Sequence, residues 1–337
     1  RSRPPPTAYR FPPTRRIQLS MSLSLHGIHA PVVTTFGADG DVDLEAFARN
    51  VRAHLDAGVD GIVVAGSTGE APLLDDAERG PLVEAARRVV PRDRVLLAGV
   101  GSESSRETIR RARTAAERGA DAVLVAAPHY YAAAATPEER TRQLRAHYRH
   151  VADASPVPVV LYNIPKYMHF AIDPALVAEL AGHGNVVGIK DSSGDDALLA
   201  SYLAAEAERF TVLTGSGSGL AAALEVGARG GILAVALFAP ALAREVRDAH
   251  VAGDAHRARA AQRKLAPLAR EIVGAMGVPG VKAALDAIGL DGGEPRLPLL
   301  PAVPAERARV AELLGEAGLL PFGEARRATE TPSESIT

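Results

Sequence analysis

Residues 118–125 read RGADAVLV, and closely similar phrases occur as AGVDGIVV at 57–64 and as VGARGGIL at 226–233. In each phrase an amphipathic, helix-like stretch ends at a glycine, which is a helix stop signal. A continuous apolar run begins two or three residues after that glycine. This joint, in which a helix leads through a short loop into a strand, is typical of repeated β/α units.

Eight apolar runs recur along the chain, about 20 to 36 residues apart. They are continuous rather than alternating, as expected of parallel strands buried on both faces. The runs begin at Gly27, Gly61, Arg94, Ala122, Pro158, Val186, Thr211 and Gly231. Their number and spacing predict a (β/α)8 TIM barrel. A doubly wound sheet is the alternative, but it needs a glycine-rich phosphate loop after the first strand, and Thr34-Thr35-Phe36 is not one.

The domain organisation follows from the distribution of these runs. We expect the barrel to occupy residues 21–237 and a C-terminal helical extension to occupy 238–322, where only helical periodicity is found. Residues 1–20 are rich in proline and arginine and contain no acid, which predicts a disordered arm. Three interpretations of this arm remain open: a transit peptide, a gene start assigned too early before Met21, or a cloning remnant. Residues 323–337 are polar and lack periodicity, so we expect a disordered tail.

Composition excludes several classes of function. The formal net charge of −2 at pH 7 gives no electrostatic reason to expect binding to nucleic acid or to an anionic membrane. No apolar run reaches the roughly 18 residues that span a bilayer. The chain has no cysteine, which rules out disulfides, thiolate metal sites and a cysteine nucleophile. A cysteine-free chain fits a reducing compartment, so we expect a cytoplasmic protein.

Polar residues at the carboxyl ends of barrel strands face the active site of such enzymes. Here these positions hold hydroxyls, phenols and one amine, and they form no cluster of carboxylates and imidazoles, so we expect neither a metal nor another cofactor. The segments are 34–35 (TT), 66–70 (GSTGE), 128–131 (PHYY), 162–163 (YN), 190–193 (KDSS) and 214–217 (TGSG).

Lys190 is the most informative of these residues, because it directly follows the apolar run Val-Val-Gly-Ile. Burial disfavours an ammonium charge, and the neutral amine is the form that attacks a ketone. The alternative is a buried structural lysine that pairs with Asp191 or Glu70. Tyr162 ends the preceding strand, where a phenol could relay protons; the alternative is a hydrogen-bonded core tyrosine.

The turn Gly66-Ser67-Thr68 offers hydroxyl and backbone donors suited to a small carboxylate. Such turns also serve simply as connections, so the signal is weak by itself. Among the remaining residues, Lys166 lies next to the expected site, whereas Lys282 falls in the helical extension and is expected to be structural. His147 and His150 lie on a charged helix and are expected to be solvated.

Taken in order, these segments resemble the dihydrodipicolinate synthase / N-acetylneuraminate lyase family from about Gly27 to Leu300. The pieces are GIHAPVVTTF, GSTGE, PHYY, LYNIP, VVGIKDSSGD, LTGSGSG and GVPGVKAALDAIGL. The resemblance implies a (β/α)8 barrel with C-terminal helices and a Schiff base between pyruvate and the lysine of strand six, here Lys190. It also implies a homo-oligomer, a dimer or a tetramer.

The same resemblance assigns roles to further positions. Tyr162 corresponds to the general acid/base, Ser67 to a proton-relay hydroxyl and Thr68 to the contact with the pyruvate carboxylate. Tyr130 corresponds to the tyrosine that family members insert into a neighbouring subunit's site. Gly215 and Ile232 correspond to further positions that line the site. Apart from the resemblance, we also expect Gly66, Lys166, Tyr167 and Ser192 to bind substrate.

One departure bears on the substrate. Dihydrodipicolinate synthases carry an arginine five residues after the strand-five tyrosine, and Tyr167 stands at that position here. The stretches PHYY, LYNIP and KDSSGD look more like 4-hydroxy-2-oxoglutarate aldolase, which forms pyruvate and glyoxylate. The alternatives are 4-hydroxy-tetrahydrodipicolinate synthase, a metal-dependent barrel lyase, and a non-catalytic barrel that binds a 2-oxo acid.

Overall fold

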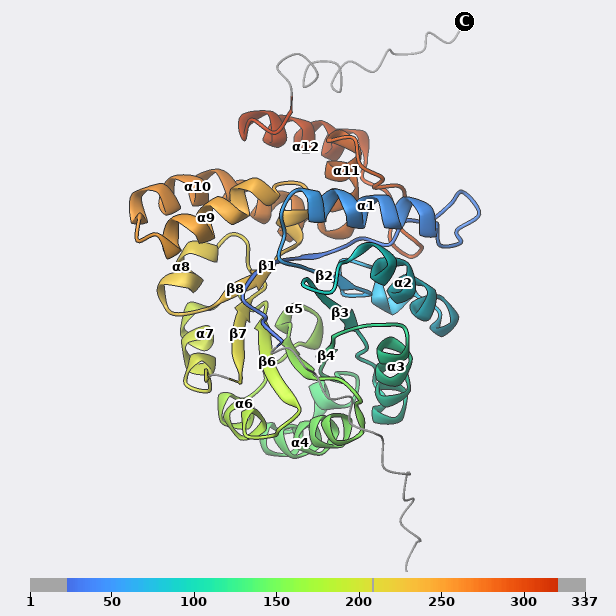
Figure 1. Ribbon diagram of the computed structural model, residues 1–337, viewed down its shortest axis with the longest axis vertical. Helices are drawn as coiled ribbons and strands as arrows, with labels where there is room; N and C mark the ends of the chain where they lie inside the picture. Colours follow the sequence, from blue (N-terminus) through green and yellow to red (C-terminus); the bar gives the residue numbers. More distant parts are fainter. Residues whose placement is uncertain (1–22, 208, 321–337) are drawn as a thin grey trace, which may run out of the picture.

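The computed structural model describes residues 23–207 and 209–320. Eight parallel strands close into a barrel in chain order, and β1 pairs with β8 through Gly27 and Gly230. This confirms the predicted TIM barrel (Figure 1). The strands are β1 (Gly27–Pro31), β2 (Gly61–Val64), β3 (Val95–Gly99), β4 (Ala122–Ala126), β5 (Val159–Asn163), β6 (Val186–Asp191), β7 (Thr211–Thr214) and β8 (Gly230–Ile232). The arm 1–20 and the tail 323–337 lie outside the described residues.

Helices follow the strands and form the outer layer (Figure 1). Their starts carry the expected capping chemistry: the side chain of Asp43 accepts hydrogen bonds from the first turn of α1, and Thr136 and Glu139 form a capping box on α4. The helices of the barrel are α1 (Leu44–Asp56), η1 (Ala71–Leu73), α2 (Asp76–Val89), α3 (Ser105–Glu117), η2 (Ala132–Ala134), α4 (Pro137–Ala154), α5 (Pro165–Met168), α6 (Pro174–Ala181), α7 (Asp196–Leu203), α8 (Leu220–Glu225) and η3 (Ala234–Leu237).

Strand interiors are apolar on both faces, as the continuous runs predicted. All residues of β2 and β5 are buried, because one face points into the barrel and the other is covered by helices. Two runs are longer than the strands they contain. The first strand ends at Pro31, and the run that begins at Gly231 leaves β8 after Ile232 and continues as the 3-10 helix η3. The apolar run at 231–237 is therefore a strand only at its start, since a short apolar run does not distinguish a strand from a buried helical turn.

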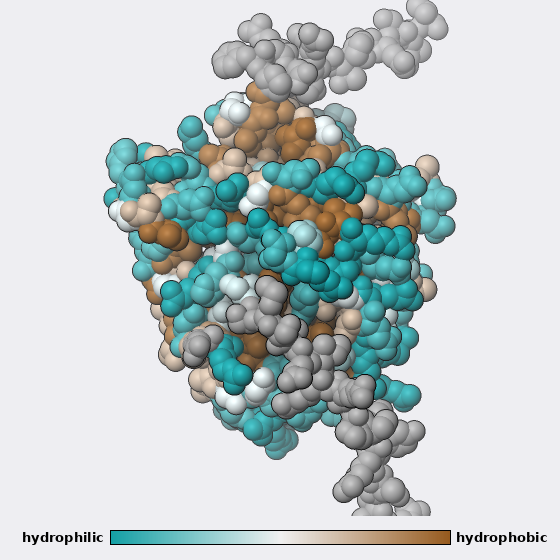
Figure 2. Space-filling model, in the orientation of Figure 1, coloured by the Kyte–Doolittle hydropathy of each residue, from teal (hydrophilic) through white to brown (hydrophobic). Residues whose placement is uncertain are grey.

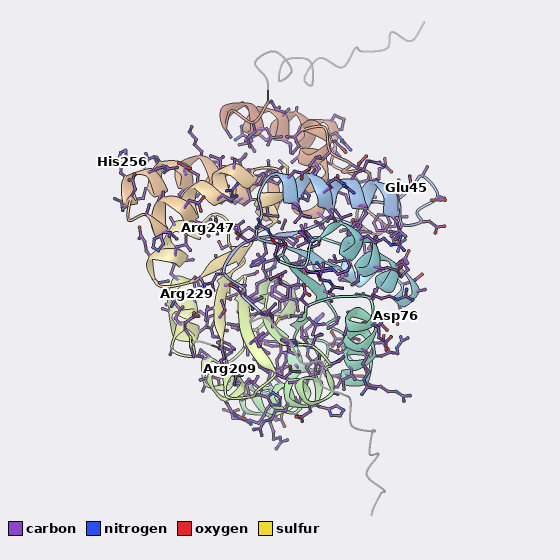
Figure 3. All side chains as sticks on the ribbon, in the orientation of Figure 1. Glu45, Asp76, Arg209, Arg229, Arg247 and His256 are labelled. Atoms are coloured by element: carbon purple, nitrogen blue, oxygen red, sulfur yellow. The ribbon has the colours of Figure 1, made fainter. Side chains whose placement is uncertain are left out.

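The C-terminal extension consists of helices that gather at one end of the molecule, next to α1 and α8 (Figure 1). They are α9 (Pro240–Val251), α10 (Ala255–Leu268), the π-helical segment η4 (Ala269–Ala275), α11 (Gly277–Ala287) and α12 (Pro304–Glu316). Arg247, labelled in Figure 3, projects from α9. It donates to the Asp60 carboxylate at 2.9 Å, and the same carboxylate accepts from the backbone N–H of Ile28 in β1. This contact ties the extension to the barrel.

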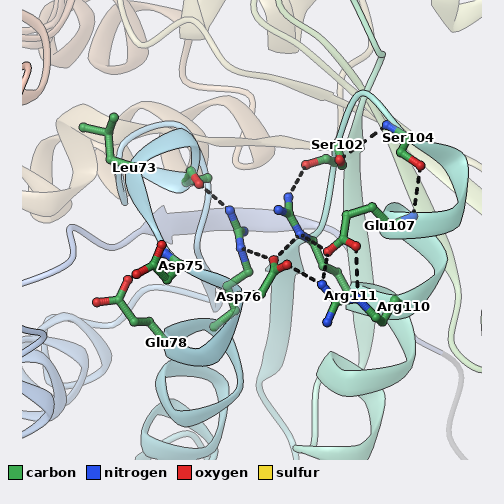
Figure 4. A network of polar contacts seen from close by, with 12 residues as sticks. Leu73, Asp75, Asp76, Glu78, Ser102, Ser104, Glu107, Arg110 and Arg111 are labelled. Atoms are coloured by element: carbon green, nitrogen blue, oxygen red, sulfur yellow. Dashed lines mark hydrogen bonds and ion pairs between the residues drawn. The ribbon is translucent and has the colours of Figure 1, made fainter.

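Outer helices of the barrel are linked by ion pairs. Asp76 at the start of α2 pairs with Arg110 and Arg111 of α3, which also contact Glu107 (Figure 4). The outer face seen in Figure 2 is mostly hydrophilic, and hydrophobic residues gather near its upper end, where α11 and α12 lie. Within residues 23–207 and 209–320, no helix combines the length and the apolar character needed to cross a membrane.

Candidate active site

A cavity with about 730 Å³ of free space, including its opening to solvent, lies where the strands of the barrel end. Most of its polar lining comes from the ends of β5 and β6 and from the segments that follow β2, β5, β6 and β7. A second set of lining residues comes from the C-terminal extension. The lining residues are Pro31, Ser67, Thr68, Tyr162, Ile164, Lys166, Tyr167, Lys190, Ser192, Gly215, Ile232, Ala234, Val273, Gly274, Gly277, Val278 and Val281.

Lys190 and Tyr162 face each other inside this cavity. The register of β5 and β6 pairs the two residues directly, and the Lys190 Nζ lies 4.2 Å from the centre of the Tyr162 ring. Lys190 is only 6% exposed. Within the described residues no carboxylate forms an ion pair with it. The alternative pairing with Asp191 or Glu70 is therefore absent: Asp191 binds its own neighbours, and Glu70 pairs with Lys282.

Asp191 organises the turn that follows β6. It accepts hydrogen bonds from the Asn163 amide at 2.7 Å and from the Ser193 hydroxyl at 2.6 Å. Burial raises the pKa of Asp191, while these hydrogen bonds act in the opposite direction. The network fixes the turn that carries Ser192 into the cavity.

Gly215 lets the chain after β7 pass close to Lys190. Its backbone N–H donates to the Asp191 carbonyl at 2.6 Å. A Cβ atom at this position would lie 2.9 Å from the Lys190 Cε and 1.8 Å from the Ser192 Oγ. A side chain here would therefore force Ser192 and Lys190 to shift.

Ser67 and Thr68 enter the cavity from the turn that follows β2. The backbone on either side is unusual, because Ala65 and Glu70 both have left-handed conformations, with φ of 52° and 58°. Thr34 supports the turn from outside the cavity, since its hydroxyl donates to the Gly69 carbonyl at 2.7 Å. Thr34 and Thr35, expected among the site-facing groups, are buried and do not line the cavity.

Lys166 and Tyr167 lie at the rim, on the short helix α5. The Lys166 ammonium donates to the carbonyl of Gly274 at 3.1 Å, which joins the barrel to the π-helical segment of the extension. Tyr167 is 49% exposed, and burial together with the nearby Tyr162 raises the pKa of its phenol. Within the described lining, no arginine reaches the cavity.

The cavity brings together most of the residues expected from the sequence, but not Gly66 or Tyr130. Tyr130 is 73% exposed and packs edge-on against Tyr131. Sequence reasoning missed the contribution of the extension, namely Val273, Gly274, Gly277, Val278 and Val281. A rule based on strand ends does not reach helical residues. The segment GVPGVKAALD, which carries part of the family resemblance, was the available signal.

Two other expectations concern groups away from the cavity. His147 was expected to be solvated, but it is buried and its Nδ1 lies 2.9 Å from the Ser105 hydroxyl. Helix α4 has a buried face that includes His147, and the many arginines of its sequence do not predict that face. Within residues 23–207 and 209–320, no group of three or more His, Cys, Asp or Glu side chains is placed to hold a metal ion.

Comparison with known proteins gives consistent matches over this fold. The model of the "Dihydrodipicolinate synthetase family" matches residues 24–317. An uncharacterized DapA-like lyase of Halobacterium salinarum is 39% identical over 298 residues, which cover 88% of this chain and 96% of the relative. 4-hydroxy-tetrahydrodipicolinate synthase 1 of Streptomyces coelicolor is 38% identical over 268 residues, which cover 79% of this chain and 85% of the relative.

A solved structure extends the comparison to a bound molecule. YagE of E. coli K12 is described as a prophage protein of the dihydrodipicolinic acid synthase family, in complex with pyruvate. It superimposes with a TM-score of 0.81 at 31% identity, and the match covers 88% of this chain and 99% of that one.

Proposed function

Because this chain belongs to the dihydrodipicolinate synthetase family of lyases, we propose that Lys190 forms a Schiff base with the 2-oxo group of a pyruvate-derived acid. The pairing of Lys190 with Tyr162 carries this proposal. A buried lysine amine without a carboxylate partner among the described residues is available to act as a nucleophile. A phenol beside it can move protons during formation and breakdown of the adduct.

The proposed reaction is a carbon–carbon cleavage. The Lys190 amine adds to C2 of the 2-oxo acid, and loss of water gives an iminium ion. The iminium accepts the electron pair of the breaking C3–C4 bond, while a base takes the proton of the C4 hydroxyl and an aldehyde departs. Protonation of the resulting enamine at C3 and hydrolysis release pyruvate and regenerate the amine. Tyr162 lies where it can donate and accept the protons of these steps.

The turn with Ser67 and Thr68 is the proposed site for the carboxylate next to the 2-oxo group. It enters the same cavity as Lys190 and offers two hydroxyls and backbone N–H groups. Ser192 and Gly215 lie on the other side of the lysine, where they shape the space for the rest of the substrate. Because the hydroxyls and backbone N–H groups of the Ser67–Thr68 turn all donate hydrogen bonds, the turn suits one small anionic group.

For the full substrate we propose 4-hydroxy-2-oxoglutarate, which would give pyruvate and glyoxylate. This acid carries a second carboxylate at its far end, and Lys166 places an ammonium at the rim of the cavity. The synthase alternative joins pyruvate to aspartate semialdehyde, and several relatives bear that name. Aspartate semialdehyde carries both a carboxylate and an amine, and the described lining contains no arginine that could bind the carboxylate.

We further propose that the active form is a dimer or a tetramer. Tyr130 projects from the segment after β4 and is largely exposed in the single chain. An exposed pair of large aromatic residues suits a contact between subunits. In such an assembly Tyr130 of one subunit would complete the proton path of another.

Covalent trapping tests the central claim. Borohydride with pyruvate should inactivate the enzyme and add the mass of a reduced pyruvate adduct to the peptide that contains Lys190. Lys190→Ala should keep the far-UV spectrum of the folded protein and lose the adduct. Labelling at Lys166 or Lys282 instead, or inhibition by EDTA without trapping, would overturn the Schiff-base assignment. Trapping without turnover of any 4-hydroxy-2-oxo acid would favour the non-catalytic barrel.

A further inference from the structure

A buried ion pair lies directly behind the turn that carries Ser67 and Thr68. Lys282 of α11 and Glu70 are each 1% exposed, and the Lys282 Nζ lies 2.9 Å from the Glu70 Oε1. Burial lowers the pKa of Lys282, while the charge of Glu70 acts in the opposite direction. An ion pair this deep is costly to form, because both charges leave water. The proposed reaction uses neither charge directly.

The remaining donors of Lys282 are all occupied. Its ammonium donates to the carbonyls of Thr34 at 2.8 Å and Glu294 at 2.9 Å. The second carboxylate oxygen of Glu70 accepts from the backbone N–H of Arg296 at 2.8 Å. The Lys282 side chain therefore connects the segment after β1, the turn after β2 and the C-terminal extension.

The contacts of Lys282 with Glu70 and with Thr34 both support the Ser67–Thr68 turn. Glu70 is two residues beyond Thr68, and its left-handed backbone is held while its side chain is anchored. Thr34, whose carbonyl binds Lys282, donates its own hydroxyl to the Gly69 carbonyl. The preceding turn of α11 lines the cavity itself through Gly277, Val278 and Val281. Helix α11 therefore both lines the cavity and contacts the residues that support the Ser67–Thr68 turn.

We propose that Lys282 is a positioning residue, which holds the Ser67–Thr68 turn in its carboxylate-binding geometry by pairing with Glu70 and binding the Thr34 carbonyl. The part of this inference that concerns the carboxylate rests on the proposed function. In this proposal the C-terminal extension contributes to the active site, because Lys282 determines the affinity for the 2-oxo acid before the Schiff base forms.

The test compares Lys282→Met and Glu70→Gln with Lys264→Met, a control in which an exposed lysine of α10 is replaced. The first readout is the pyruvate concentration that gives half-maximal borohydride trapping at Lys190. We expect it to rise at least tenfold in Lys282→Met and Glu70→Gln, with trapping at saturating pyruvate preserved. Lys264→Met should match the wild type.

The second readout is amide hydrogen exchange over residues 66–74 without any substrate. It should accelerate in Lys282→Met and Glu70→Gln, because the anchored turn is released, and stay unchanged in Lys264→Met. A lowered melting temperature with unchanged half-maximal pyruvate and unchanged exchange at 66–74 would show a purely structural pair and overturn the proposal. Should Lys282→Met not fold, Glu70→Gln decides by the same two readouts.

These readouts separate two failures. If wild-type protein gives no pyruvate adduct at Lys190, the proposed function fails. The exchange measurement still decides whether Lys282 holds the turn, since it needs no substrate.

Discussion

Tyr162 and Lys190 are register partners on neighbouring strands, and the lysine ammonium lies 4.2 Å from the centre of the tyrosine ring. Strand pairing fixes the two Cα atoms, so the phenol and the amine meet without help from a flexible loop. Rigid elements hold reacting groups more closely than loops do. The register therefore fixes the relative position of the two residues that we propose as catalytic.

Removing the Tyr162 hydroxyl should impair catalysis and leave the fold intact. General acid–base catalysis contributes about 10²- to 10⁴-fold, so we expect Tyr162→Phe to lower kcat within that range. The matched control is Tyr202→Phe, because the Tyr202 hydroxyl donates to the Ile172 carbonyl at 2.6 Å outside the cavity. That variant should lose about 1 kcal/mol of unfolding free energy with kcat unchanged. Equal kcat for Tyr162→Phe and the wild type would remove Tyr162 from the mechanism.

A methyl group at residue 215 should disable the site by displacing Lys190 and Ser192. The added Cβ of Gly215→Ala would overlap the Ser192 Oγ and crowd the Lys190 Cε. A displacement of 1 Å at a reacting group can cost about 10²-fold, so we expect at least that loss in kcat/KM. Gly184→Ala is the control, since a Cβ there meets no atom within 4 Å. Steady-state kinetics of both variants measure the effect. A Gly215→Ala enzyme with wild-type kcat/KM would contradict the close approach of residue 215 to Lys190 and Ser192.

The barrel could be predicted from the sequence because its signals are local. A helix that ends at glycine before an apolar run, repeated along the chain, needs no knowledge of distant contacts. The same holds for Lys190 and Tyr162, which stand at strand ends in a fold that brings all strand ends together.

The rest of the site depends on contacts between segments far apart in the chain. Nothing local to Lys282 says that it meets Glu70, or that the carbonyl of Gly274 accepts from Lys166. His147 shows a related difficulty, because an arginine-rich helix does not reveal which of its faces is covered. Placement of the extension against the barrel decides the first two contacts, and packing of α4 against α3 decides the third. Periodicity alone determines neither.

Buried histidines should make the protein sensitive to mild acid. Burial lowers the pKa of His54 and of His147 to about 4, from an ordinary value of 6.5. The unfolded chain takes up these protons as pH falls below 6.5, whereas the folded chain resists until about pH 4, so the unfolding free energy decreases over that window. Between pH 7 and pH 5 each histidine should account for about 2 kcal/mol.

Denaturant titrations at pH 7 and pH 5 check this expectation. His54→Gln should shrink the loss of unfolding free energy between the two pH values, because one of the buried imidazoles is gone. His256→Gln replaces an exposed histidine of α10 and should leave the pH dependence unchanged. An identical acid response in His54→Gln and wild type would show that His54 is not a source of the sensitivity.

Substrate choice should depend on Lys166 and Tyr167, because the proposed contacts to Lys190, Ser67 and Thr68 are the same for every 2-oxo acid substrate. If Lys166 binds the distal carboxylate, Lys166→Met should lose a charge-assisted hydrogen bond of about 1.5–3 kcal/mol, or roughly 10- to 150-fold in kcat/KM for 4-hydroxy-2-oxoglutarate. Substrates without a distal carboxylate should be cleaved as before. The loss should therefore be selective, and a uniform loss across substrates would mean that Lys166 only supports the rim through Gly274.

Tyr167→Arg tests the same rim in the opposite direction. An arginine here offers a planar fork that can bind the carboxylate of aspartate semialdehyde through two hydrogen bonds, which a lysine cannot reproduce. Tyr167 is half-exposed at the rim, so the longer side chain has room without disturbing the core. We expect condensation of pyruvate with aspartate semialdehyde to be weak in the wild type and to rise about tenfold or more in Tyr167→Arg, a gain of about 1.4 kcal/mol in transition-state binding. Competing the two substrates measures this directly. A wild-type enzyme that prefers aspartate semialdehyde by tenfold or more in kcat/KM would be a 4-hydroxy-tetrahydrodipicolinate synthase, because the distal carboxylate would then be held without an arginine.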